Sequence, residues 1–183
     1  MTLYVTRHGE TEWNAKHIIS GLAEIPLAEK GLEQAVALAS RLAERQNDYR
    51  IKHILVSPLG RARKTASYIE KALGIEAVVE ERLHEIDFGA FEHTSTRGAE
   101  FLAIKANPYK RFPGGESLLY AAHRVYGAIE DARARYAPDN LLFVCHGMVS
   151  SLISTYFQDY ETIEEFTNSG FENCGLQAYE FKW

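Results

Sequence analysis

Four side chains that could do chemistry together lie at or just after the ends of short apolar runs: Arg7, His8, Arg61 and His146. Two of them are guanidinium groups, which bind anion oxygens through charge-assisted and often bidentate hydrogen bonds. The other two are imidazoles, which can act as nucleophiles or exchange protons near neutral pH. Two neighbouring arginines need an anion to offset their charge, and phosphate suits guanidinium geometry. The set therefore predicts a phosphate-binding site.

The same residues indicate how a phosphoryl group would be transferred. A neutral histidine is the only candidate nucleophile among them, because a guanidinium group cannot attack phosphorus. The remaining cations would neutralise the phosphoryl oxygens in the transition state, so the scheme needs no metal ion or other cofactor. Gly9 and Gly147 would let the backbone approach the ligand closely. Since His8 must be neutral to attack and His146 is better charged, activity should fall on both sides of a pH optimum.

The leaving oxygen of a phosphate ester also needs a proton. The stretch LHEIDFGAFEHTS supplies three carboxylic acids, Glu85, Asp87 and Glu92. A carboxyl group beside a phosphate has a raised pKa, so it keeps a proton to donate. The residue types alone leave the choice among the three open.

The elements that must position these residues alternate between strand and helix patterns. Runs rich in β-branched and aromatic residues predict strands over about 3–5, 51–56, 76–79, 141–145 and 173–183, the last at a sheet edge. Helical spacing, such as that of Leu32, Val36 and Ala39, predicts helices over about 29–46, 60–73, 118–132 and 148–157. This alternation predicts a three-layer α/β/α fold, with a mostly parallel sheet and a ligand site at its carboxyl edge.

Residues 81–117 differ from the rest of the chain in having weak periodicity and several prolines and glycines. A helix over about 96–106 is the only regular element predicted there. We expect one domain over residues 1–183, in which this 81–117 segment covers the active site and determines substrate specificity.

Composition excludes several classes of partner. The chain carries 20 Lys and Arg against 25 Asp and Glu, and this net charge of −5 argues against a nucleic-acid or acidic-membrane binder. No apolar stretch approaches the roughly 20 residues that cross a bilayer. Two cysteines make no disulfide framework, so we expect a cytoplasmic protein. The C-terminal edge strand could pair with a second copy, which leaves a homodimer open.

Other charged and nucleophilic residues have simpler interpretations. Cys145 precedes His146, but the cysteine phosphatase pattern requires an arginine six residues later, where this chain has Ser151. We expect Cys145 to be a small buried residue. The remaining histidines lack the spacing of a metal site. The series Arg124, Arg133 and Arg135 is expected on the solvated face of a long helix.

Six blocks in order, RHGETEWN, PLAEKGLEQA, SPLGRARKTA, LHEIDFGAFE, FPGGES and VCHG, resemble the histidine phosphatase superfamily, the phosphoglycerate-mutase-like proteins, over nearly the whole chain. The resemblance implies that His8 becomes a phosphohistidine. It implies a phosphate pocket formed by Arg7, Arg61 and His146, and it selects Glu85 as the proton donor. It also places three further residues beside the transferred phosphate or the substrate: Asn14, Ser20 and Gly21.

The superfamily contains both mutases and phosphatases. The mutases carry a tyrosine three residues after the proton-donor glutamate and a lysine eleven residues after it, where this chain has Phe88 and Thr96. Their arginine pair for the substrate carboxylate is also absent, with Lys110-Arg111 as a shifted substitute. We therefore expect a histidine acid phosphatase-type phosphomonoesterase acting on a small phosphorylated metabolite. Mutase-type phosphoryl transfer is the alternative, and a catalytically idle phospho-ligand-binding protein is the third.

Overall fold

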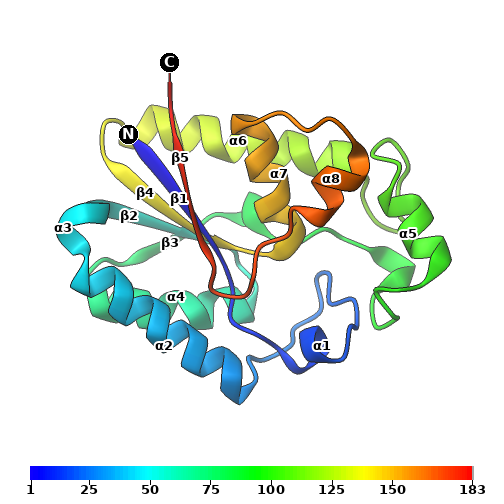
Figure 1. Ribbon diagram of the computed structural model, residues 1–183, viewed down its shortest axis with the longest axis horizontal. Helices are drawn as coiled ribbons and strands as arrows, with labels where there is room; N and C mark the ends of the chain where they lie inside the picture. Colours follow the sequence, from blue (N-terminus) through cyan, green and yellow to red (C-terminus); the bar gives the residue numbers. More distant parts are fainter. Residues whose placement is uncertain (183) are drawn as a thin grey trace.

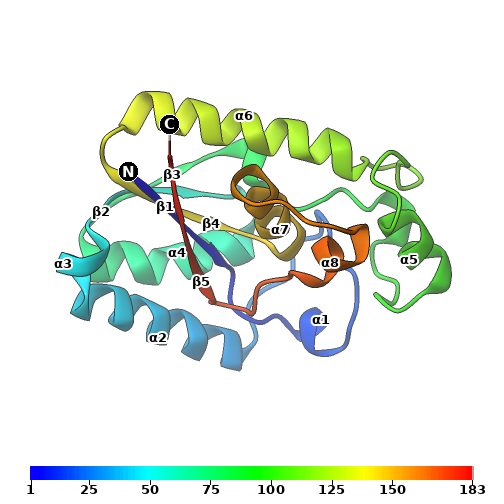
Figure 2. The ribbon, with the colours of Figure 1, turned by 45° about the horizontal axis from the view of Figure 1, so that its top comes forward.

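The computed structural model describes residues 1–182, apart from the side chain of Asn168, and contains one five-stranded sheet between two layers of helices (Figure 1, Figure 2). The strands are β1 (Thr2–Arg7), β2 (Ile51–Val56), β3 (Ala77–Val79), β4 (Asn140–Cys145) and β5 (Leu176–Glu180). Their spatial order is β3-β2-β4-β1-β5, with every pairing parallel except that of β5 with β1. The predicted α/β fold and edge strand are confirmed, while Trp183, part of the strand prediction, lies outside the described residues.

The long helices coincide with those predicted from periodicity. They are α2 (Glu29–Glu44), α4 (Gly60–Leu73), α5 (Ala99–Lys105), α6 (Leu118–Tyr136) and α7 (Gly147–Phe157). Three helices of four to six residues were not predicted, because they are too short to show a helical period: α1 (Glu12–Ala15), α3 (Gln46–Tyr49) and α8 (Ile163–Asn168). Two 3₁₀ turns, η1 (Glu81–Leu83) and η2 (Gly89–Phe91), complete the set.

Successive side chains along each strand point to opposite faces of the sheet, and each face has its own hydrophobic core. Leu3, Leu55 and Phe143 pack in the core on the face covered by α6 and α7. Tyr4 and Leu142, their neighbours along the chain, pack on the opposite face with residues of α2 and α4. A strand that is buried on both faces has a continuous run of apolar residues, which explains the sequence LLFVC of β4.

Helix α2 turns a different face to the core from the one its sequence suggested. Val36, expected on the apolar face, is 47 % exposed, whereas Gly31, Ala35 and Leu38 are buried. The small residues decide the orientation, because they let the helix approach its neighbours closely. A Cβ atom on Gly31 would lie 2.0 Å from the main-chain oxygen of Glu10. The predicted face of this helix was therefore wrong in part.

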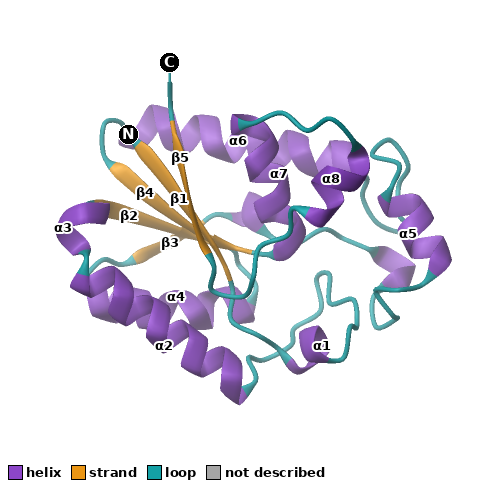
Figure 3. Cartoon of the chain, in the orientation of Figure 1, coloured by secondary structure: helices purple, strands orange, loops and turns teal. Residues whose placement is uncertain are grey.

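The carboxyl ends of the parallel strands point toward α1, α5 and α8, where most of the long loops gather (Figure 3). The 81–117 segment lies at this end, and its core is a cluster of aromatic rings. Phe88 and Phe101 pack with ring centroids 5.4 Å apart, and both contact Phe112. No helix in the described residues is both long and apolar enough to cross a membrane.

Candidate active site

A cavity of about 250 Å³ opens at the carboxyl end of the sheet. Eight of the nine site residues predicted from the sequence line it: Arg7, His8, Asn14, Ser20, Gly21, Arg61, Glu85 and Gly147. The ninth, His146, is fully buried beside it, with its ring centroid 5.2 Å from that of His8. The fold thus brings together residues from β1, α4, the end of β4 and the 81–117 segment.

The hydrogen bonds of His8 define its tautomer. Its Nδ1 lies 2.7 Å from the main-chain oxygen of Gly9, which can only accept, so Nδ1 carries the proton. Its Nε2 accepts a hydrogen bond from Nε of Arg61 at 3.2 Å, so Nε2 holds the lone pair. Burial, followed by the charges of Arg61 and Arg7, lowers the pKa of His8 well below its usual value. His8 is therefore a neutral imidazole whose Nε2 can act as a nucleophile.

Arg61, in the first turn of α4, has a guanidinium group that donates three hydrogen bonds. Besides His8, it donates to the main-chain oxygens of Ala23 (2.8 Å) and Gly21 (2.7 Å). The N-terminus of the same helix is capped by Glu24, whose carboxylate accepts from the amide of Gly60 at 3.0 Å. The 20–24 loop and α4 therefore fix the guanidinium group against the histidine.

Arg7, the last residue of β1, donates from Nη1 to the main-chain oxygen of Phe171 at 3.0 Å. Its guanidinium lies over Gly147, where a Cβ atom would come within 3.5 Å of the Arg7 Cζ. Gly147 therefore leaves space beside Arg7. Gly9, for which the same role was predicted, does not line the cavity, and its Cβ position lies 2.3 Å from the main-chain oxygen of Gly31. That glycine is needed for packing against α2.

His146 is held by Ser57, which follows β2, through a 2.7 Å hydrogen bond between Nε2 and Oγ. Burial, then the charges of Arg61, His8 and Arg7, lowers the pKa of His146 well below its usual value. Burial and the nearby guanidinium groups therefore disfavour, in this arrangement, the charged form that we expect of His146 in catalysis.

Three buried polar atoms have no hydrogen-bond partner in the described part of the chain: Nε of Arg7, Oγ of Ser20 and Nδ1 of His146. All three belong to the predicted site. Native proteins rarely leave buried polar groups unpaired, so each such atom needs an explanation. Arg7 and Ser20 can donate hydrogen bonds from these atoms, and His146 can do so when its Nδ1 carries a proton. A bound anion would accept all three hydrogen bonds.

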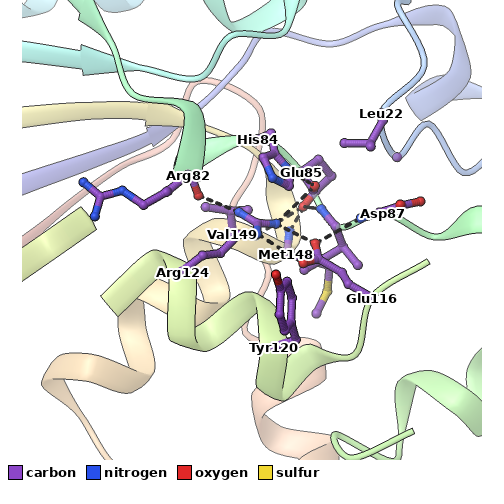
Figure 4. Close-up of polar contacts among 12 residues, drawn as sticks. Leu22, Arg82, His84, Glu85, Asp87, Glu116, Tyr120, Arg124, Met148 and Val149 are labelled. Atoms are coloured by element: carbon purple, nitrogen blue, oxygen red, sulfur yellow. Dashed lines mark hydrogen bonds and ion pairs between the residues drawn. The ribbon is translucent and has the colours of Figure 1, made fainter. Parts of the chain in front are cut away.

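Of the three carboxylates left open by residue type, Glu85 alone lines the cavity. Its side chain accepts hydrogen bonds from the amides of Ile86 (3.0 Å), Met148 (3.2 Å) and Val149 (3.3 Å), the last two in the first turn of α7 (Figure 4). The helix that follows β4 thus fixes the carboxylate at the cavity wall. The other two candidates bind backbone amides elsewhere: Asp87 accepts from Gly89 and Glu92 accepts from Leu22.

The backbone around Glu85 is held by a buried ion pair between Arg124 of α6 and Glu116 (Figure 4). Arg124 donates to Glu116 at 2.7 Å and also to the main-chain oxygens of Arg82 (2.5 Å) and Glu85 (3.2 Å). Glu116 in turn accepts from the amide of Asp87 at 3.1 Å. The prediction that Arg124 lies on a solvated face was wrong, because its side chain is only 10 % exposed.

Several residues of this region were missed by sequence reasoning. The side-chain amide of Asn173 donates to the main-chain oxygen of His8 at 2.8 Å, and only the tertiary fold brings it there. Lys105 lines the cavity, whereas the substitute pair Lys110-Arg111 does not. Lys110 is exposed, and the Arg111 guanidinium lies 5.2 Å from the ring centroid of Tyr120.

Neither cysteine contributes a reactive group to the cavity. Cys145 is fully buried, as expected, and burial raises the pKa of its thiol. Burial also raises the pKa of Cys174 to about 12. Within the described residues no group of three or more His, Cys, Asp or Glu side chains is arranged to hold a metal ion.

Comparisons with known proteins agree with this geometry. Residues 3–182 match the sequence model of the histidine phosphatase superfamily (branch 1). A relative from Cronobacter sakazakii, named probable phosphoglycerate mutase GpmB, is 35 % identical over 163 residues, which cover 85 % of this chain and 74 % of the relative. The solved structure of a mycobacterial glucosyl-3-phosphoglycerate phosphatase has a TM-score of 0.86 and 25 % identity, covering 100 % and 92 % of the two chains. An alpha-ribazole phosphatase from Shigella flexneri has a TM-score of 0.80 and 26 % identity, covering 100 % and 91 %.

Proposed function

We propose that this chain, which belongs to the histidine phosphatase superfamily (branch 1), is a metal-independent phosphomonoester hydrolase that acts on a small phosphorylated metabolite through a phosphohistidine. Residues 1–183 would form one catalytic domain, with the 81–117 segment as one wall of the site. The observation that carries the proposal is the set of three unpaired polar atoms, on Arg7, Ser20 and His146, which belong to residues that line or adjoin the same cavity as His8.

In the first step, Nε2 of His8 forms a bond to phosphorus while the ester P–O bond breaks. The leaving oxygen takes a proton from Glu85. Arg7, Arg61 and His146 offset the charge on the remaining phosphoryl oxygens, and an anion bound there would favour the protonated form of His146.

In the second step, water attacks the phosphohistidine and passes a proton to Glu85. The P–N bond breaks, inorganic phosphate leaves, and His8 returns to its neutral form with the proton still on Nδ1. The cavity volume of about 250 Å³ lies below the 300–1,000 Å³ range of pockets for drug-sized ligands, which supports a small substrate.

The first experiment is phosphate release from p-nitrophenyl phosphate in excess chelator, with wild type, His8→Ala and the control His53→Ala. His53 is a partly exposed histidine that is paired with Asp139 and does not line the cavity. We expect turnover in the wild type and the control, and none in His8→Ala. Acid-labile labelling of the wild type by ³²P-substrate, absent in His8→Ala, would report the intermediate. Equal turnover of wild type and His8→Ala would overturn the proposal.

A mutase remains the second candidate, because the Cronobacter relative is named a probable phosphoglycerate mutase. Phe88 and Thr96 favour the phosphatase, since both line the cavity at positions where the mutases carry a tyrosine and a lysine. Product analysis separates the two: a phosphatase releases inorganic phosphate in proportion to substrate consumed, whereas a mutase yields a phosphorylated isomer with little free phosphate.

A further inference from the structure

Lys105, the last residue of α5, lines the cavity together with the phosphate-binding residues but comes from a different part of the fold. Arg7 and Arg61 project from the sheet edge and α4, whereas α5 lies beyond the carboxyl ends of the strands (Figure 1). Apolar side chains, including Phe88, Phe101 and Met148, line the same cavity. The cavity therefore has positive charge from two separate regions and an apolar surface as well.

The side chain of Lys105 is partly buried, and no carboxylate in the described part of the chain lies within ion-pair distance of it. Its ammonium group donates to the main-chain oxygen of Thr167 at 3.3 Å. An ammonium group has three donors, so further donors remain for the cavity. Burial lowers the pKa of Lys105, and the more distant charge of Glu85 offsets this only in part, so the cation is incompletely compensated.

Because charges are rarely buried without a partner, an anion in the cavity would explain the position of Lys105. The phosphoryl group attacked by His8 already has Arg7, Arg61 and His146 beside it. We propose that Lys105 binds a second anionic group of the substrate, so that the preferred substrates are small phosphomonoesters that also carry a carboxylate or a second phosphate. This inference rests on the proposed phosphomonoesterase function and extends it to a substrate class.

The test compares substrates of equal size that differ in one charge: 3-phosphooxypropanoate and its neutral amide, with homologues one to three carbons longer. We expect the wild type to prefer the best carboxylate over its amide by about tenfold in kcat/KM, the scale of one hydrogen bond to a charged group. Lys105→Gln should lower that ratio to about one, mainly through KM for the carboxylate. The side-chain amide introduced by Lys105→Gln can still donate to the main-chain oxygen of Thr167, so we expect the variant to fold normally. A parallel series of alkanediol bisphosphates and their monophosphates reports whether the second anion is a phosphate.

Two variants control for charge and position. Lys105→Arg keeps a cation and should retain the preference, and Lys110→Gln removes an exposed lysine of the same segment and should leave the ratio unchanged. If the ratio in Lys105→Gln equals that of the wild type, or the wild type prefers neither the carboxylates nor the bisphosphates, the inference is wrong. If no ester is hydrolysed at all, the proposed function fails. Dissociation constants of the same substrate pairs, measured by calorimetry with wild type and Lys105→Gln, then decide the role of Lys105 independently.

Discussion

Removing the guanidinium group of Arg124 should destabilise the protein and displace Glu85 at the same time. In Arg124→Met, Glu116 keeps a carboxylate that is only 7 % exposed and retains its hydrogen bond from the Asp87 amide. The main-chain oxygens of Arg82 and Glu85 lose donors at 2.5 Å and 3.2 Å. Breaking a buried ion pair costs about 3–5 kcal/mol, and we expect a loss of unfolding free energy in that range.

Urea denaturation, followed by tryptophan fluorescence and circular dichroism, measures the loss. The matched control is Asp131→Asn. Asp131 lies on α6, like Arg124, and forms an exposed ion pair with Arg82, so its loss should cost less than about 1 kcal/mol. The double variant Arg124→Met/Glu116→Leu removes both charges and should recover much of the stability. A loss below about 1 kcal/mol in Arg124→Met would refute the reasoning from burial.

Activity measurements show whether the Arg124–Glu116 pair positions Glu85 or only stabilises the fold. An alkyl phosphate has a poor leaving group that needs a proton, whereas p-nitrophenolate leaves without one. If the pair positions Glu85, the stable double variant should lose roughly tenfold in kcat on the alkyl ester, part of the 10²–10⁴-fold that general acid catalysis contributes. Turnover of p-nitrophenyl phosphate should change little. An equal loss on both esters would show that the pair does not act through Glu85.

Three further results are expected. His8 and His146 have folded-state pKa values below the ordinary 6.5, so the unfolded chain binds more protons just below that pH. Unfolding free energy should then rise with pH up to about 6.5, by at most about 1.4 kcal/mol per pH unit for each histidine, with a shallower slope close to pH 6.5. The slope should be smaller in His8→Asn and His146→Asn. Unchanged slopes in urea titrations at pH 5, 6 and 7 would contradict this. Ser57→Ala removes the 2.7 Å partner of His146 and should cost about 1–3 kcal/mol in urea denaturation and lower kcat more than it raises KM. Cys145→Ala should keep most of the phosphatase activity, because the buried thiol has a raised pKa and plays no chemical part; loss of activity without loss of stability would argue otherwise.

The sequence was sufficient to predict most of the fold because its strongest signals are local. A strand such as β4 is buried on both faces and forms an unbroken apolar run, and α4 is followed by Gly74, which adopts φ +68° and terminates the helix. The short helices left only weaker signals. Helix α1 is fixed by a capping box between Thr11 and Asn14, and α8 begins at Thr162, whose side chain accepts from the amide of Glu165. Capping patterns, not periodicity, could have indicated both.

The residues of the site also fall into two groups, those that local sequence signals predict and those that they do not. His8, Arg61 and His146 lie at or just after strand ends, and parallel strands bring their carboxyl ends to one edge of a sheet, so the grouping of these residues was predictable. Lys105 and Asn173 depend on how the 81–117 segment and the chain before β5 fold over that edge. Such long-range packing has no periodic pattern in the sequence, and it also buries Arg124, which helical spacing alone suggested was solvated.

The close packing of Gly9 against Gly31 has a consequence for how the substrate range of this protein could be changed. At this contact main chain meets main chain, so no side-chain exchange there can be absorbed by rotation of a neighbour. The wall that carries the nucleophile is therefore fixed, whereas α5 presents to the cavity a side chain outside the apolar core, that of Lys105. Mutant libraries for new substrates should vary Lys105 and leave both glycines untouched, which would alter selectivity without displacing the attacking imidazole.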